Sequence, residues 1–123
     1  MTTTIDPSFL RAIVLLTGFK LKPMLAAQSA MLLIGLRGVE FRATDIPADI
    51  TRGSKHLAGA ACGALLTQGL IEVVRREKSP DPKAKGRRLD VYRIPASKFT
   101  TVRKWLAGNG VDADQLPREG MLL

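Results

Sequence analysis

The sequence predicts a mainly α-helical domain that carries one small β-hairpin, an α+β fold. Three observations lead to this class. Apolar residues recur at helical spacing along much of the chain. Two short apolar runs, Leu70–Arg75 and Leu89–Ile94, flank a loop rich in proline and charge. The length of 123 residues and the hydrophobic fraction of 46% fit a single domain with a packed core.

Two helices are expected before the middle of the chain, and each has a proline near its start. Asp6 and Pro7 begin a flanking helix over about residues 7–17. The second helix is expected over Pro23–Leu36. Because almost no charge interrupts it, we expect this helix to lie at the centre of the core.

A short strand, a short helix and a longer helix are expected next. Val39–Arg42 alternates apolar and polar residues, as a half-buried strand does. Thr44 can cap a short helix over Asp45–Ile50. After a tight turn, Ser54 can cap a helix over Ser54–Gln68.

The chain is expected to finish with a helix and an irregular tail. The two apolar runs form the strands of the hairpin, and a last flanking helix follows over about residues 97–107, with Ser97 as its cap. Residues 108–123 show no clear pattern. We therefore expect residues 1–123 to form one domain, with its core in about residues 23–94.

Positive charge dominates the chain and is concentrated in one stretch. The formal net charge is +8 at pH 7. Residues 75–88 hold seven basic and two acidic residues, so this stretch carries +5. Such a balance favours a polyanionic partner such as nucleic acid.

The chain has few residues suited to catalysis or to metal binding. Cys62 is the only cysteine and His56 the only histidine. The single cysteine excludes an intramolecular disulfide and a zinc site built on several thiolates, and we expect Cys62 to be a small buried residue. We expect no enzyme activity, no cofactor and no metal. Without a secretory signal or about 20 consecutive apolar residues, the expected location is the cytoplasm, with no membrane contact.

Two segments carry a resemblance to a known superfamily. They are ATDIPADITRGSKHLAGAACGALLTQGLIEV, which begins at Ala43, and VVRREKSPDPKAKGRRLDVYRI, which begins at Val73. From about Pro23 to Ile94 the chain resembles the winged helix-turn-helix superfamily, and it looks most like small regulators of the MarR and ArsR type. The resemblance implies double-stranded DNA as partner, with the second helix of the motif in the major groove and a basic wing beside it.

The resemblance also implies which residues contact DNA. Around the start of the second helix the candidates are Arg52, Ser54, Lys55 and His56. On the wing they are Arg76, Lys78, Lys83, Lys85, Arg87 and Arg88. We expect the wing to supply much of the affinity and the helix mainly the position.

The outward face of that helix is expected to be unusually bare. It reads His56, Gly59, Ala60, Gly63 and Thr67, and so lacks the long polar side chains that read base edges. One interpretation is close approach to a phosphate backbone or to another helix. The other is a face that is simply solvated or that packs on another segment of the protein.

The favoured function is therefore a DNA-binding protein that regulates transcription. We expect a homodimer, because the flanking helices carry more apolar surface than a small domain needs; light scattering of the purified chain measures this. The alternative is a protein-interaction or adaptor module in a replication, transcription or phage or plasmid complex.

Overall fold

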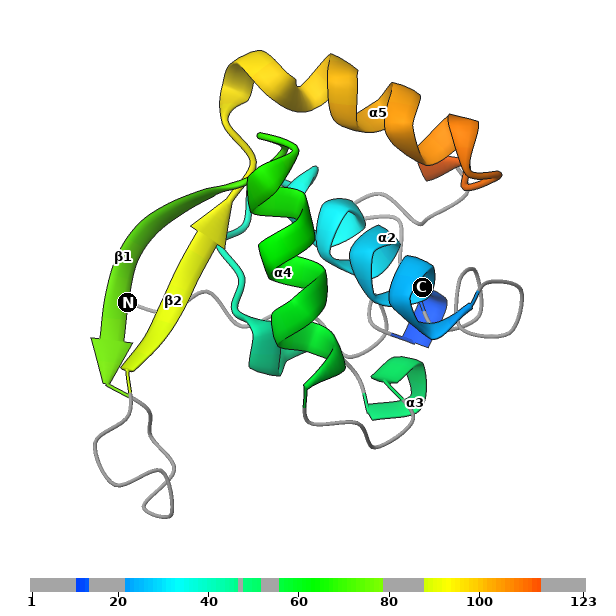
Figure 1. Ribbon diagram of the computed structural model, residues 1–123. Helices are drawn as coiled ribbons and strands as arrows, with labels where there is room; N and C mark the ends of the chain where they lie inside the picture. The colour runs from blue at the N-terminus through cyan, green and yellow to red at the C-terminus, as the bar shows by residue number, and fades with distance from the viewer. Residues whose placement is uncertain (1–10, 14–21, 47, 52–55, 79–87, 114–123) are drawn as a thin grey trace, which may run out of the picture.

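The computed structural model describes residues 11–13, 22–46, 48–51, 56–78 and 88–113 (Figure 1). The described part is mostly helical with one two-stranded antiparallel sheet, which confirms the predicted α+β class. Only residues 11–13 of the expected first helix are described, and they are helical. The elements are α2 (Pro23–Gly35), η2 (Ala43–Asp45), α3 (Ala48–Thr51), α4 (Leu57–Thr67), β1 (Glu72–Lys78), β2 (Arg88–Arg93), η4 (Ala96–Lys98) and α5 (Phe99–Gly108).

Helix α2 is the centre of the core, as its sequence predicts. Pro23 stands at its first turn, where a missing N–H costs nothing. All residues from Ala26 to Gly35 are buried. Helices α3, α4 and α5 pack against α2, and α5 lies across the C-terminal end of α4 (Figure 1). None of the described helices is both long and apolar enough to cross a bilayer.

The end of α2 touches the base of the hairpin closely at Gly35. A Cβ atom built on Gly35 would lie 2.6 Å from Cδ1 of Ile94 and 3.2 Å from Cε1 of Phe41. Both neighbours are buried, at 5% and 0% exposure, so a side chain at this position has to displace core residues. Gly35 therefore lets the helix, the hairpin and the segment around Phe41 meet.

The predicted strand Val39–Arg42 is reduced to a single residue. Phe41 forms an isolated antiparallel bridge with Tyr92 of β2. The N–H of Phe41 donates to the Tyr92 carbonyl at 3.0 Å, and the N–H of Tyr92 donates back at 2.8 Å. Phe41 thus forms a one-residue third strand on the edge of β2 that does not pair with β1.

The predicted helix Asp45–Ile50 is wrong in its extent, because the chain forms η2 and then α3 instead. Ile46 between them is extended, with φ −75° and ψ 127°. It precedes Pro47, and a residue before proline is disfavoured in the helical region. The N–H of Arg42 donates to the Asp45 carboxylate at 2.7 Å, so Asp45 rather than Thr44 makes the local cap contact.

Helix α4 and the hairpin occupy the expected places with shifted ends. Described α4 begins at Leu57, and the predicted cap Ser54 lies outside the described residues. Gly69 (φ +74°) ends it, with the N–H of Leu70 donating to the Leu65 carbonyl at 3.1 Å. Strand β1 starts only at Glu72, because Leu70 and Ile71 are buried in the core instead of pairing with β2.

The last helix also differs at its start. Ser97 lies inside η4 and does not cap α5, which begins at Phe99 with no side-chain cap. Val102 and Leu106 are buried, as their helical spacing predicts. Gly110 (φ +80°) ends α5, and Val111 after it is buried, so the described start of the tail packs on the core.

Replacing Gly35 by alanine should destabilise the protein. The new methyl group has to displace buried Ile94 or Phe41. Overpacking of this kind costs about 1–3 kcal/mol in the free energy of unfolding. Urea unfolding followed by circular dichroism measures it.

Gly63→Ala is the matched control, because nothing lies within 4 Å of a Cβ atom there. That change should stabilise α4 by up to about 1 kcal/mol through helix propensity. Equal stability of the Gly35→Ala variant and the wild type would contradict the close contact.

Candidate nucleic-acid interface

Helix α4 and the hairpin lie side by side, and the start of α4 lies at the same end of the molecule as the outer ends of the two strands (Figure 1). The chain leaves the C-terminal end of α4 and turns directly into β1, which runs back along the helix (Figure 1). The start of α4 and the ends of the strands at Lys78 and Arg88 therefore point the same way (Figure 1). One extended ligand can contact both elements.

The bare face predicted for α4 is present and faces solvent. His56, Gly59, Ala60, Gly63 and Thr67 are all exposed. Space is open around both glycines, with nothing within 4 Å of a Cβ atom built on either. The opposite face of α4 is buried through Ala61, Cys62 and Leu65. Packing of this face against another described segment is therefore excluded, whereas a solvated face and close approach of a phosphate backbone or another helix are both compatible with it.

The hairpin has two sides, and its register decides which residue lies on which. Residues opposite one another in antiparallel strands share a side. A bulge at Val74 breaks the simple alternation along β1. One side, named here the helix side, holds Val73, Arg76, Lys78, Arg88, Asp90 and Tyr92. The other, named the far side, holds Glu72, Arg75, Glu77, Leu89, Val91 and Arg93.

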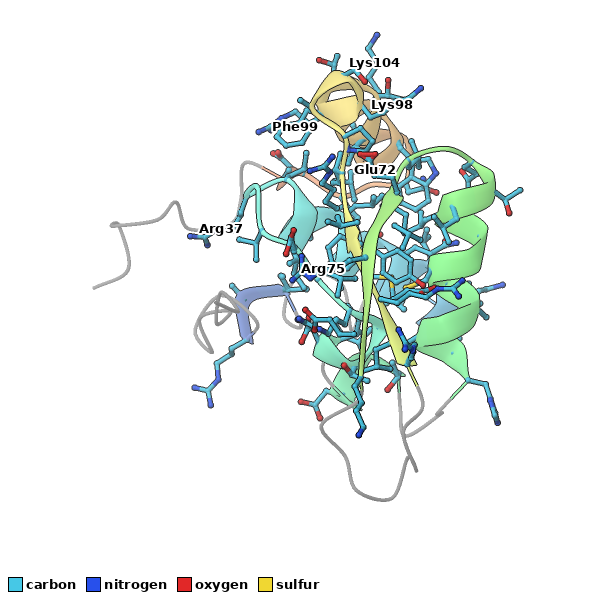
Figure 2. The ribbon with its side chains drawn as sticks, turned by 90° about the vertical axis from the view of Figure 1, so that its left-hand side faces the viewer. Arg37, Glu72, Arg75, Lys98, Phe99 and Lys104 are labelled. Carbon is cyan, nitrogen blue, oxygen red and sulfur yellow. The ribbon has the colours of Figure 1, made fainter. Side chains whose placement is uncertain are left out.

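The contact of Tyr92 and the position of Arg75 show which side of the hairpin faces α4. The side chain of Tyr92 is in hydrogen-bonding contact with Cys62 of α4 and belongs to the core. Figure 2 shows Arg75 on the opposite side of β1 from α4. The helix side is thus the side of the hairpin that faces α4.

Ion pairs occupy the far side. Arg75 pairs with Glu40 at 2.7 Å and with Glu77 at 2.8 Å. The guanidinium Nε of Arg42 donates to Glu77 at 3.0 Å, and a second nitrogen pairs with the same carboxylate. Arg42 is only 13% exposed, so this pair is partly shielded from water. The pairs fasten β1 to the segment that precedes η2.

These contacts shift the ionisation of two far-side groups. Hydrogen bonds from Arg42, and then from Arg75, lower the pKa of the Glu77 carboxyl. Hydrogen bonds to Glu40, and then to Glu77, raise the pKa of Arg75. Both groups therefore stay charged near neutral pH, and each compensates the other.

The helix side holds positive charge that is less compensated. Arg76 pairs with Asp90 at 3.0 Å but is 70% exposed. Lys78 and Arg88 stand opposite one another across the strands, and both are exposed. Among the described residues neither has an acidic partner within ion-pair distance. Two like charges therefore face each other near the end of the hairpin.

The described candidate residues are all exposed. His56 lies at the start of α4, and Arg76, Lys78 and Arg88 lie on the helix side. Arg52, Ser54, Lys55, Lys83, Lys85 and Arg87 lie outside the described residues. The far-side pairs through Arg42, Glu40 and Glu77 were not anticipated, since they join residues 35 positions apart.

Cys62 is buried, as predicted, and lies between α2 and β2. Its Sγ is 3.5 Å from the Met31 sulfur, and it contacts Tyr92. Burial raises the pKa of the Cys62 thiol to about 11. Burial also raises the pKa of Tyr92 to about 12. Both groups are therefore neutral near pH 7 and serve packing.

Comparison with known protein-family models, with curated proteins and with solved structures found no match.

Replacing Glu77 by glutamine should destabilise the protein at pH 7 and matter less in acid. A lowered folded-state pKa contributes stability that is present above the ordinary carboxyl value of 4.5 and is lost as pH falls through the lower folded value. The difference in stability between the wild type and Glu77→Gln should therefore shrink as pH falls below 4.5. Urea unfolding at pH 7 and pH 3 measures this. Glu72→Gln, whose partner Arg93 is exposed, should cost less at pH 7; equal costs would contradict the role of Arg42.

Cys62 should resist thiol reagents until the protein unfolds. The thiolate is the reactive form, and burial with a pKa of about 11 suppresses it at pH 8. A thiol-reactive chromophore should leave the native protein unlabelled in buffer. In urea it should label one site per chain, because the chain has one cysteine. The free energy of unfolding should also fall as pH rises from 9 towards 11, and Cys62→Ala should remove that part. Rapid labelling of the native protein would contradict the burial.

Proposed function

We propose that this chain is a winged helix-turn-helix protein that binds double-stranded DNA and regulates transcription. The order of the described elements supports it. Helices α3 and α4 correspond to the two helices of the turn motif, and β1 with β2 to the wing. Phe41 lies on the edge of β2, where a third short strand belongs in such a domain.

The observation that carries the proposal is the shared direction of α4 and the hairpin. The start of α4, the end of β1 and the start of β2 lie at one end of the molecule (Figure 1). Residues 75–88, which carry +5 of the net +8, belong to that hairpin. A duplex laid across this end meets a helix N-terminus, which favours anions, and a basic hairpin.

The exposed face of α4 sets the expected mode of recognition. With glycine and alanine along it, the backbone can approach a phosphate strand closely, but few side chains can reach base edges. Affinity then comes mainly from phosphate contacts. Sequence preference comes from the start of α4, from the wing and from DNA shape.

A protein-interaction module is the second candidate, and one observation favours it. The same bare face of α4 is open around Gly59 and Gly63, and the apolar side chain of Val73 on β1 is 42% exposed. Such a surface also accepts a partner helix at close distance. The two functions differ in their response to DNA and to salt.

Duplex binding at low salt should be strong and should weaken steeply as salt rises. Replacing Lys85, Arg87 and Arg88 by glutamate should abolish it, because three phosphate contacts become repulsive. Fluorescence anisotropy with a labelled random-sequence duplex, repeated over a salt series, measures affinity and slope. Circular dichroism verifies that the variant is folded. If the wild type binds no duplex even at low salt, the adaptor function replaces the DNA-binding one.

A further inference from the structure

We propose that the hairpin contacts the DNA backbone through its helix side, with Lys78 and Arg88 holding a phosphate between them. The far side of the hairpin stays off the DNA. This inference rests on the proposed DNA-binding function and names which surface of the hairpin performs it. The ligand class is the phosphodiester backbone of duplex DNA.

Charge separates the two sides of the hairpin. The helix side has three basic residues and one acid, Asp90, a balance of +2. The far side has Arg75 and Arg93, with Arg42 packed against it, and these three cations meet four acids. The far side and its neighbours therefore carry −1. The four acids are Glu40, Asp45, Glu72 and Glu77.

The cations on the far side are already engaged. Arg75 has two carboxylate partners, at 2.7 and 2.8 Å, and Arg93 has Glu72 at 3.0 Å. A phosphate approaching this side has to displace those carboxylates or lie beside them. Repulsion between like charges opposes both arrangements.

Lys78 and Arg88 offer the opposite situation. They form a directly opposed cross-strand pair of like charge, which is unfavourable in the free protein. Side chains in such pairs start about 5 Å apart, so both can reach one phosphate group. An anion placed between them removes the repulsion and forms charge-assisted hydrogen bonds.

The position of this pair fits the rest of the interface. Lys78 is the last residue of β1 and Arg88 the first residue of β2, so both lie at the end of the hairpin towards the start of α4 (Figure 1). They are on the same side as Tyr92, which contacts α4. A DNA strand that contacts the exposed N-terminal part of α4 can therefore continue across the helix side of the hairpin.

Two double variants with the same change of charge test the inference. Lys78→Gln with Arg88→Gln alters the helix side, and Arg75→Gln with Arg93→Gln alters the far side. With a labelled duplex, the helix-side variant should bind about tenfold or more weakly and lower the salt slope by about 1, the value for one lost phosphate contact. The far-side variant should keep its affinity within about threefold and keep the slope.

Single variants protect the test against unfolding of the hairpin. Arg88→Gln and Arg93→Gln each remove one exposed charge from β2 without removing a core residue. Arg88→Gln should weaken binding and Arg93→Gln should not. Equal losses in either matched set would overturn the inference while leaving DNA binding in place. A wild type that binds no duplex would overturn the proposed function and the inference together.

Discussion

The whole candidate interface depends on a closed ring of contacts around Gly35. The end of α2 touches Ile94 and Phe41 there, at distances that leave no room for a side chain. Phe41 is bonded in both directions to Tyr92, and Tyr92 contacts Cys62 of α4. The ring closes at the 3.5 Å contact between the sulfur atoms of Cys62 and Met31 on α2. Helix and hairpin thus have a fixed relation because both are packed on one central helix.

Polar contacts add a second connection outside this core. Arg42 and Glu40 reach the hairpin from the segment before η2, through Glu77 and Arg75. Most of these side chains are at the surface, where ion pairs contribute little to stability. Their larger consequence is the distribution of charge. They compensate one side of the hairpin and leave Lys78 and Arg88 on the other as cations without an acidic partner among the described residues.

Helix α4 has a well-packed inner face and an outer face that contains two glycines, residues of low helix propensity. Glycine inside a helix costs roughly 1 kcal/mol relative to alanine. Gly59 and Gly63 incur that cost where no described neighbour requires them, since open space surrounds both. Within the described part of the chain, packing therefore gives no reason for them. Close approach of a ligand backbone or a partner helix gives one.

The sequence by itself determined the α+β class, the central helix, the basic hairpin, the burial of Cys62 and the outward face of α4. Each follows from local periodicity, composition or turn residues. Only the tertiary structure decided which charges are available. Plain alternation places Arg75 on the side of Val73, but the bulge at Val74 puts Arg76 and Lys78 there instead. The carboxylates that engage Arg75 and Arg42 include partners 35 residues away, a distance over which no local pattern operates.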